Sequence, residues 1–246
     1  MSSSPIVEWE SATEFSVNGY RFTLDYQHGG SKVRSEDHRF LMMKGLSFLK
    51  HYTSLDPSAC RRVLELGVYQ GGSFVFMDQL LKPEKLSAVE LNATPIPALD
   101  AYVARSGGRC RVHYGTSQDD TEALSRIVRE DFGGALDLVV DDASHWYKQT
   151  RTSFETLFPM VRPGGLYIIE DWSWSFQDDF QRPDHDWIAI ESPANLVVDL
   201  MEEMVRGHLI QDIRIFPDLL IVQRNDTPTG SVFASQARRG RAFQPL

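Results

Sequence analysis

The chain has 246 residues, 42% of them hydrophobic, which is enough to bury one large core. Its 34 acidic and 25 basic residues give a formal net charge of −9, which argues against a nucleic-acid backbone as the principal partner. A cationic or small neutral ligand is compatible with this charge. We expect a soluble cytoplasmic protein, because the sequence shows no signal peptide and no apolar stretch of membrane-spanning length. Cys60 and Cys110 form neither a metal-ligand pattern nor a disulfide framework.

Residues 1–55 are expected to decorate the main domain. Within EFSVNGYRFTLDY, Asn18-Gly19 lies between two alternating segments, and this pattern predicts a hairpin. Farther along, Ser35 suits a helix N-cap and apolar residues follow it at helical spacing. A helix is therefore predicted over residues 35–52.

Residues 27–38 are a candidate lid. Gly29-Gly30 would provide a hinge, and Lys32 or Arg34 would supply a charge for a substrate. The approach to the predicted helix explains the same segment nearly as well, so both interpretations stay open.

Five short apolar runs mark the main domain, which is predicted over residues 56–228. Segments of helical character and ordinary crossover length separate the runs. Five β-α units in a row predict a doubly wound, mostly parallel sheet. The runs are residues 61–66, 85–91, 110–114, 135–140 and 165–170.

The last apolar stretch, residues 210–224, differs from these units. It offers two strands about Pro217-Asp218 with no room for a helix between them, which requires antiparallel pairing. The predicted fold class is therefore α/β, with a seven-stranded, mostly parallel sheet and an antiparallel C-terminal hairpin. Residues 229–246 place three arginines among Ser, Gln, Ala and Gly, which is typical of a flexible, solvated tail.

A glycine-containing loop, VLELGVYQGGSF, follows the first core strand. It carries Glu65, Gly67, Gly71 and Gly72, and glycines let a backbone approach a ligand closely. Tight packing between strand and helix would explain the glycines alone, and neither G-x-G-x-x-G nor a phosphate-binding P-loop is present. Glu90, at the end of the second strand, can bind the two hydroxyls of a ribose, and Glu65 suits a ligand with an amino group. A nucleotide-like ligand is inferred.

The stretch VVDDASHW ends a strand that is apolar at nearly every position, as in a parallel sheet covered on both faces. Ligands of open α/β sheets bind beyond the carboxyl ends of the strands, where Asp141, Asp142 and His145 are expected. The alternative is that Asp142 and Ser144 cap a helix beginning near His145, since Asp and Ser are favoured N-caps.

Together these motifs resemble the class I S-adenosylmethionine-dependent methyltransferases, which have a Rossmann-like fold. The resemblance covers residues 62–224: the loop ELGVYQGG, Glu90 in AVELN, GTSQDD after the third strand, VVDDASH after the fourth, and the closing hairpin. DDASH followed by LFPMVRPGGLYIIEDW is most similar to the metal-dependent O-methyltransferases of antibiotic and sugar tailoring. These include macrolide sugar methyltransferases and the group labelled cephalosporin hydroxylase.

The resemblance implies a metal site and a base. The metal carboxylates of the family match Asp142 and Asp171, with Glu170 as a further candidate, and the histidine that acts as general base matches His145. Carboxylates and water favour Mg²⁺. Ala143 stands where the family commonly has Gly, which leaves the charged positions intact. Strand-end polarity would explain Glu170 about as well, and His145 alone would more often be a surface or capping histidine.

Further residues are expected at the cofactor. Ser117, Gln118 and Asp119 follow the third strand and are expected on the adenine side, although Asp119 could equally cap the next helix. Asp141 is expected to place a favourable charge near the sulfonium or amino group, with structural capping as its alternative.

The predicted function is Mg²⁺-dependent O-methylation, by S-adenosyl-L-methionine, of a hydroxyl group on a sugar or other small natural product. A vicinal diol would suit the metal, and His145 would take the hydroxyl proton. The alternatives are a metal-independent or N-methyltransferase, and a non-catalytic S-adenosylmethionine-binding partner of a tailoring oxidase. The glycine spacing and the closing hairpin disfavour a nicotinamide-dependent dehydrogenase.

The aromatic and acidic segment WSWSFQDDFQRPDHDW, residues 172–187, is too long and polar for an ordinary tight connection. Loops of this size are often lids or binding loops, so it is expected to line the acceptor pocket. A subunit contact is the alternative, since exposed aromatic residues also mark interfaces. We expect a homo-oligomer with no membrane or nucleic-acid partner.

Overall fold

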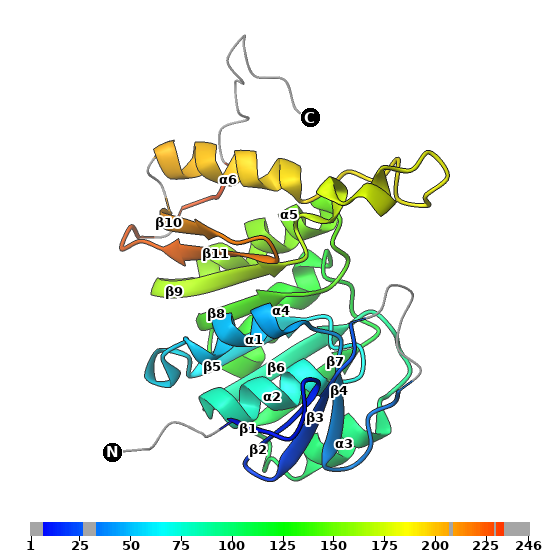
Figure 1. Ribbon diagram of the computed structural model, residues 1–246. Helices are drawn as coiled ribbons and strands as arrows, with labels where there is room; N and C mark the ends of the chain where they lie inside the picture. The colour runs from blue at the N-terminus through cyan, green and yellow to red at the C-terminus, as the bar shows by residue number, and fades with distance from the viewer. Residues whose placement is uncertain (1–6, 27–32, 207–208, 229, 234–246) are drawn as a thin grey trace. The chain divides into compact units, whose positions relative to one another are not determined.

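The computed structural model describes residues 7–26, 33–206, 209–228 and 230–233 (Figure 1). The chain divides into two compact units, Met1–Ser117 and Gln118–Leu246, and the division falls inside the predicted main domain. Gly29-Gly30 and Lys32 of the candidate lid lie outside the described residues, as do residues 234–246 of the predicted tail. Among the described residues, no helix has the length and apolar character needed to span a membrane.

The first unit contains three parallel strands in the order β5-β6-β7. Their bounds are Arg62–Leu66, Lys85–Glu90 and Cys110–Tyr114, and α2 (Gly72–Leu81) and α3 (Pro97–Ala104) connect them. A short 3-10 turn, η1, covers Pro57–Ala59 before the first of these strands. The strands lie where the apolar runs predict them, because each run is long enough for a strand and too short for a helix.

A second sheet of the first unit has the order β1-β2-β3-β4, with bounds Val7–Trp9, Glu14–Val17, Tyr20–Leu24 and Arg39–Met42. The predicted hairpin is present as β2 and β3. Its turn residues Asn18 and Gly19 both have positive φ, 50° and 83°, as the tight turn between two strands requires.

The helix predicted over residues 35–52 is wrong for its first half. Residues Arg39–Met42 form β4, parallel to β3, and the helix α1 is confined to Leu46–Thr53. The Ser35 side chain does not cap a helix, because its Oγ accepts a hydrogen bond from the Leu41 backbone N–H at 3.0 Å. Pairing with β3 buries Phe40, Leu41 and Met42 together, and this tertiary contact outweighs the helical spacing.

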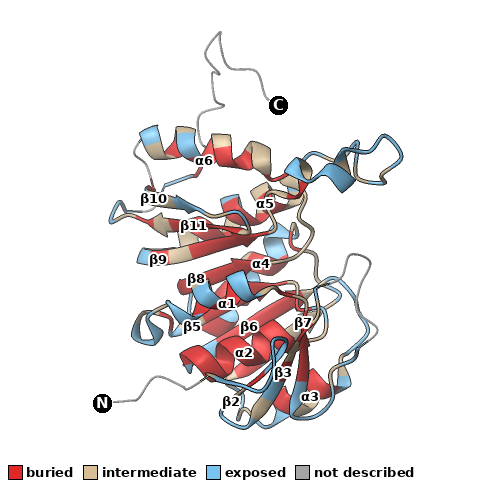
Figure 2. Cartoon of the chain, in the orientation of Figure 1, coloured by how far each residue is buried: buried red, intermediate tan, exposed pale blue. Residues whose placement is uncertain are grey.

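The N-terminal sheet packs closely against α2. The ring of Phe76 on α2 contacts the rings of Phe15 and Phe22 edge-on, with both centroid distances 5.6 Å. A Cβ atom added to Gly72 would lie 1.9 Å from the Leu41 carbonyl oxygen, so only glycine fits where β4 crosses the start of α2. All ten residues of α2 are buried as a result (Figure 2).

The second unit contains four strands in the order β8-β9-β11-β10. β8 (Leu136–Asp141) runs parallel to β9 (Val161–Glu170), while β11 (Leu219–Arg224) is antiparallel to both β9 and β10 (Ile210–Ile215). Its helices are α4 (Thr121–Phe132), α5 (Tyr147–Leu157) and α6 (Ala194–Arg206), with 3-10 turns at Phe158–Met160 (η2), Trp174–Phe176 (η3) and Asp178–Gln181 (η4). The predicted antiparallel hairpin is thus confirmed.

With the three strands of the first unit, these four make the seven strands of a Rossmann-like α/β fold with a mostly parallel sheet. The prediction of the fold class is confirmed. β8 is buried at all six positions, which accounts for the apolar residues at four of them, Leu136 and Leu138–Val140.

The start of the predicted tail packs onto the second unit. Val232 is 5% exposed, and the backbone N–H of Phe233 donates to Glu203 Oε2 at 3.1 Å. The Phe233 ring also lies 4.4 Å from the guanidinium of Arg151 on α5. These two residues are therefore part of the folded structure.

Candidate active site

The glycine-containing loop of the first unit is held by Glu90 at the end of β6. Glu90 Oε2 accepts hydrogen bonds from the backbone N–H groups of Val68 (3.1 Å) and Tyr69 (3.2 Å), and Oε1 accepts one from Asn92 (2.8 Å). Gly67 and Tyr69 have positive φ, 82° and 48°, which aims these N–H groups at the carboxylate. An ionised carboxylate has about four acceptor positions, so Glu90 keeps capacity for a ligand hydroxyl.

Two of the loop glycines face protein atoms. Gly71 has φ 81°, and a Cβ there would lie 3.0–3.1 Å from Leu99 side-chain atoms, while Gly72 meets the β4 backbone as described above. Glu65 is fully buried in β5. Packing therefore gives a reason for glycine at positions 71 and 72. The roles of all five residues toward a cofactor stay predictions: Glu65, Gly67, Gly71, Gly72 and Glu90.

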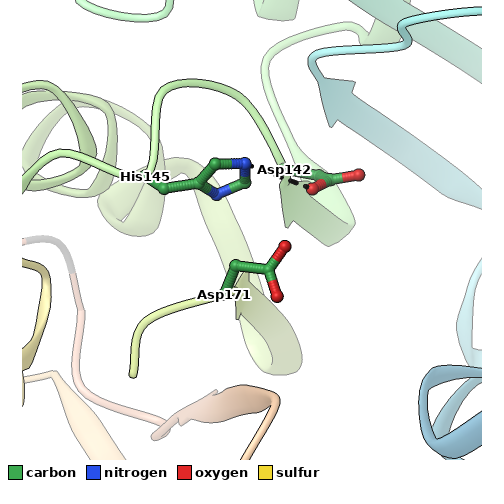
Figure 3. Close-up of side chains that lie close together, drawn as sticks. All are labelled: Asp142, His145 and Asp171. Atoms are coloured by element: carbon green, nitrogen blue, oxygen red, sulfur yellow. Dashed lines mark ion pairs between the residues drawn. The ribbon is translucent and has the colours of Figure 1, made fainter. Parts of the chain in front are cut away.

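The second unit brings three of the predicted site residues together (Figure 3). Asp142, His145 and Asp171 each offer one ligand atom, and these atoms all lie within 4.8 Å of one another. His145 Nε2 lies 3.9 Å from Asp142 Oδ1, and both side chains are 22% exposed. Glu170 is 1% exposed and is not part of this group, so its metal role stays a prediction.

Strand pairing explains this convergence. Asp141 and Ile169 are paired in the parallel β8 and β9, so the residues that follow them leave the sheet at the same edge. His145 and Asp171 both have left-handed backbones, with φ 56° and 50°. This conformation is uncommon in residues other than glycine and is concentrated at functional sites.

The capping interpretation does not account for Asp142. Helix α5 begins at Tyr147 and its N-cap is Trp146, without a side-chain cap. Ser144 Oγ accepts a hydrogen bond from the Trp146 N–H at 3.2 Å, so a serine hydroxyl supports the turn. The carboxylate of Asp142 is instead directed to the cluster with His145 and Asp171 (Figure 3).

Asp141 lies in a buried network beneath this edge. Its carboxylate accepts hydrogen bonds from Gln118 Nε2 (3.0 Å), Ser153 Oγ (2.6 Å) and Tyr167 OH (2.9 Å). Burial raises the pKa of Asp141 to about 6, against the opposing effect of the Ser153 and Tyr167 hydroxyls. Burial and the nearby Asp141 carboxylate also raise the pKa of Tyr167 well above its ordinary value.

Gln118 connects the network to the loop that carries His145. Its Oε1 accepts a hydrogen bond from the Ser144 backbone N–H at 2.7 Å, while its amide nitrogen donates to Asp141. Gln118 and Asp141, both predicted to contact the cofactor, thus form hydrogen bonds with protein neighbours. Pairing over 23 positions in the sequence gives no local signal, so sequence patterns could not have shown this arrangement.

Ser117 and Asp119 are partly exposed beside Gln118. The cap of α4 is Asp120, whose Oδ1 accepts the Ala123 N–H at 2.9 Å. The alternative interpretation of Asp119 as the cap is therefore wrong by one position, because the helix begins at Thr121. Contacts of Ser117 and Asp119 with adenine stay predictions.

Known proteins resemble the region that carries these features. Residues 64–172 match the model of a family described as a methyltransferase domain, and this range includes Glu90, Asp142, His145 and Asp171. The chain carries an S-adenosylmethionine-dependent methyltransferase domain.

Curated relatives of this methyltransferase domain are sugar O-methyltransferases. The chain is 57% identical over 54 residues to mycinamicin VI 2''-O-methyltransferase of Micromonospora griseorubida, covering 22% of this chain and 13% of that protein. It is 38% identical over 119 residues to 8-demethyl-8-(2-methoxy-alpha-L-rhamnosyl)-tetracenomycin-C 3'-O-methyltransferase of Streptomyces olivaceus, covering 45% of this chain and 27% of that protein. The chain thus matches less than a third of the length of either relative.

A solved structure supports the same family. The MycE methyltransferase from the mycinamycin biosynthetic pathway, in complex with Mg and SAH, is 26% identical with a TM-score of 0.56, over 73% of this chain and 48% of that chain. A caffeoyl-CoA O-methyltransferase described as putative, from Staphylococcus aureus, is 16% identical with a TM-score of 0.55 and shows the fold alone.

Proposed function

We propose that this chain is an S-adenosylmethionine-dependent O-methyltransferase that methylates a sugar hydroxyl of a small natural product. The observation that carries the proposal is the cluster of Asp142, His145 and Asp171 at the strand ends of a methyltransferase domain. The curated relatives support the acceptor class, since one is named for 2''-O-methylation of mycinamicin VI and the other for 3'-O-methylation of a rhamnosyl-tetracenomycin.

The cluster fits a divalent cation. Two carboxylates and an imidazole offer ligand atoms within 4.8 Å of one another, and all three residues are partly exposed, so an ion can reach them. Asp142 and Asp171 would hold the ion, and carboxylate oxygens favour Mg²⁺ over softer metals. A divalent ion there supplies Lewis-acid chemistry, because it lowers the pKa of a neighbouring hydroxyl group.

His145 would act as the general base. Methyl transfer forms a bond between the acceptor oxygen and the methyl carbon, and the bond from that carbon to sulfur breaks with its electron pair left on sulfur. As the oxygen attacks, the proton of the acceptor hydroxyl passes to an imidazole nitrogen of His145, the role that histidine most often has in general base catalysis. Asp142 Oδ1 lies 3.9 Å from Nε2, so a carboxylate stands beside the ring that would take the proton.

Within the first unit, Glu90 is a candidate residue for cofactor binding. Glu90 is the last residue of β6, keeps acceptor capacity for ribose hydroxyls, and accepts the backbone N–H groups of Val68 and Tyr69. S-adenosylmethionine supplies the methyl group on a sulfonium centre, so the protein's task is to place the acceptor oxygen in line with it.

Calorimetric titration with S-adenosylhomocysteine, with Mg²⁺ and again after chelation, tests the cofactor, and NAD serves as the control ligand. We expect binding of S-adenosylhomocysteine in both conditions and none of NAD. Methyl transfer to glycosylated acceptors, followed by mass spectrometry, should require a divalent ion. Full turnover in EDTA would support a metal-independent enzyme, and binding without turnover on a broad acceptor panel would support a non-catalytic partner protein.

A further inference from the structure

The segment between β9 and α6 is fixed to the loop that carries His145. The indole Nε1–H of Trp174 donates a hydrogen bond to the His145 carbonyl oxygen at 2.8 Å. The backbone N–H of Tyr147, two residues after His145, donates to the Glu191 carbonyl oxygen at 2.9 Å. The beginning and the end of the segment thus both contact the His145 loop.

Trp174 is itself held firmly. It is 5% exposed, although it lies in a segment with many exposed residues. Its ring packs against Phe180 at 5.2 Å and Trp187 at 5.1 Å, and Trp187 meets Trp146 edge-on at 6.2 Å. The donor at Nε1 is therefore placed by a cluster of four aromatic side chains rather than by a freely moving loop.

The peptide group that Trp174 contacts belongs to a residue with an unfavourable backbone. His145 has φ 56°, a conformation that costs a non-glycine residue free energy and persists only where neighbours enforce it. The preceding residue, Ser144, is held by Gln118 through its N–H at 2.7 Å. Trp174 donates a hydrogen bond to the carbonyl oxygen of His145 itself. Hydrogen bonds therefore restrain the backbone on both sides of the His145 Cα atom.

We propose that Trp174 is a positioning residue for His145: its indole N–H fixes the left-handed backbone at His145 and thereby aims the imidazole at Asp142 and Asp171. This proposal rests on the proposed function for the use of the imidazole as a base, but the positioning itself does not require methyl transfer. It also gives residues 172–191 a defined role, which is to restrain the loop that carries His145.

The first test reads the position of His145 without any activity. Protein labelled with ¹³C-histidine gives ring signals, and the His145 signal is assigned by its loss in His145→Gln. We expect a single sharp signal in the wild type and a shifted or broadened one in Trp174→Phe, which keeps an aromatic ring but lacks the N–H donor. Trp172→Phe is the matched control, because Trp172 Nε1 donates its hydrogen bond to the Phe216 carbonyl at 2.7 Å. An unchanged His145 signal in Trp174→Phe would overturn the proposal.

A second variant separates the hydrogen bond from ring packing. Trp174→benzothienylalanine, introduced by codon reassignment, keeps the bicyclic shape and replaces the N–H by sulfur, so it stays informative where Trp174→Phe folds poorly. It should shift the His145 signal as Trp174→Phe does. A wild-type signal in this variant would show that ring packing suffices and would contradict the proposal.

A double-mutant cycle, measured by kcat for methyl transfer, then tests whether Trp174 acts on the reaction through His145. Trp174→Phe should lower kcat by about tenfold with little change in KM. In a His145→Ala background the same substitution should cost nothing further, because its effect passes through the imidazole. An equal loss in both backgrounds would contradict the proposal. If His145→Ala itself leaves kcat unchanged, the base in the proposed function fails, and the histidine signals still decide the role of Trp174.

Discussion

The glycine-containing loop and the edge that carries Asp142, His145 and Asp171 are both unusual in sequence, but their residues behave differently in the structure. In the loop, Gly72 faces the Leu41 carbonyl, and Glu90 accepts backbone N–H groups. At the edge, three partly exposed side chains from two strand ends converge within 4.8 Å. Glycines in a loop fit packing and ligand binding equally well, whereas convergence of costly charged groups calls for a function.

The largest expected effect is at Asp171. Asp171→Asn should lower methyl transfer by about a hundredfold or more, because loss of a metal carboxylate removes several kcal/mol of stabilisation of the transition state. Binding of Mn²⁺, followed by electron paramagnetic resonance, should weaken in parallel. Glu84→Gln, which changes an exposed carboxylate of the first unit, is the control. Unchanged Mn²⁺ affinity in Asp171→Asn would separate the cluster from metal binding.

His145 distinguishes a base from a metal ligand. As a base, His145→Gln should lower kcat by about a hundredfold and leave Mn²⁺ affinity close to that of the wild type. If His145 is instead a ligand, the same substitution would weaken metal binding, and the wild type would favour a softer ion such as Zn²⁺ over Mg²⁺. Titrations of both proteins with Mg²⁺, Mn²⁺ and Zn²⁺ decide between these outcomes.

Gly72 tests whether the glycine-containing loop serves packing. Gly72→Ala should lower the free energy of unfolding by about 3 kcal/mol, because the new Cβ would overlap the β4 backbone. Gly45→Ala is the matched control, since its Cβ would have a nearest neighbour at 3.8 Å, an ordinary contact. Urea denaturation measures both. A variant that keeps wild-type stability but loses affinity for S-adenosylhomocysteine would show that Gly72 serves the ligand.

The smallest expected effect is a pH dependence from Asp141. Its pKa is raised from 3.8 to about 6 in the folded protein, so the folded state binds more protons than the unfolded state between these values. The contribution of Asp141 to stability is therefore present below pH 3.8 and is lost as the pH rises to about 6, by at most about 1.4 kcal/mol per pH unit. Asp141→Asn should remove this slope from urea denaturation measured between pH 4 and 7. A wild-type slope in the variant would assign it to other groups.

Much of the fold could be predicted from the sequence because its signals are local. The apolar runs of β5 to β9 are bounded by turns, and Asn18-Gly19 gives its hairpin directly. Residues 39–42 could not be placed, since their apolar pattern fits a helix as well, and only pairing with β3 decides for a strand. Local patterns failed where a distant partner determines the conformation.

The candidate site shows the same contrast between local sequence signals and distant partners. Asp142, His145 and Asp171 could be found because strand ends of a parallel sheet collect functional side chains. The roles of Gln118 and Trp174 could not, because their hydrogen bonds to the His145 loop join residues far apart in the sequence. The buried hydrogen bonds of Asp141 to Ser153 and Tyr167 could not be predicted either, and its role at the cofactor stays a prediction. A charged residue at a strand end can be a structural partner of the functional residue beside it.

The most direct test of the proposed enzyme is methyl transfer from S-adenosylmethionine to a panel of glycosylated acceptors that includes mycinamicin VI, with Mg²⁺ and with EDTA. Mass spectrometry of the products identifies the modified hydroxyl. The proposed function predicts a methylated sugar in the presence of Mg²⁺, no product in EDTA, and little product with Asp171→Asn. Product formation by the wild type in EDTA at the level reached with Mg²⁺, or full activity of Asp171→Asn with Mg²⁺, would contradict it.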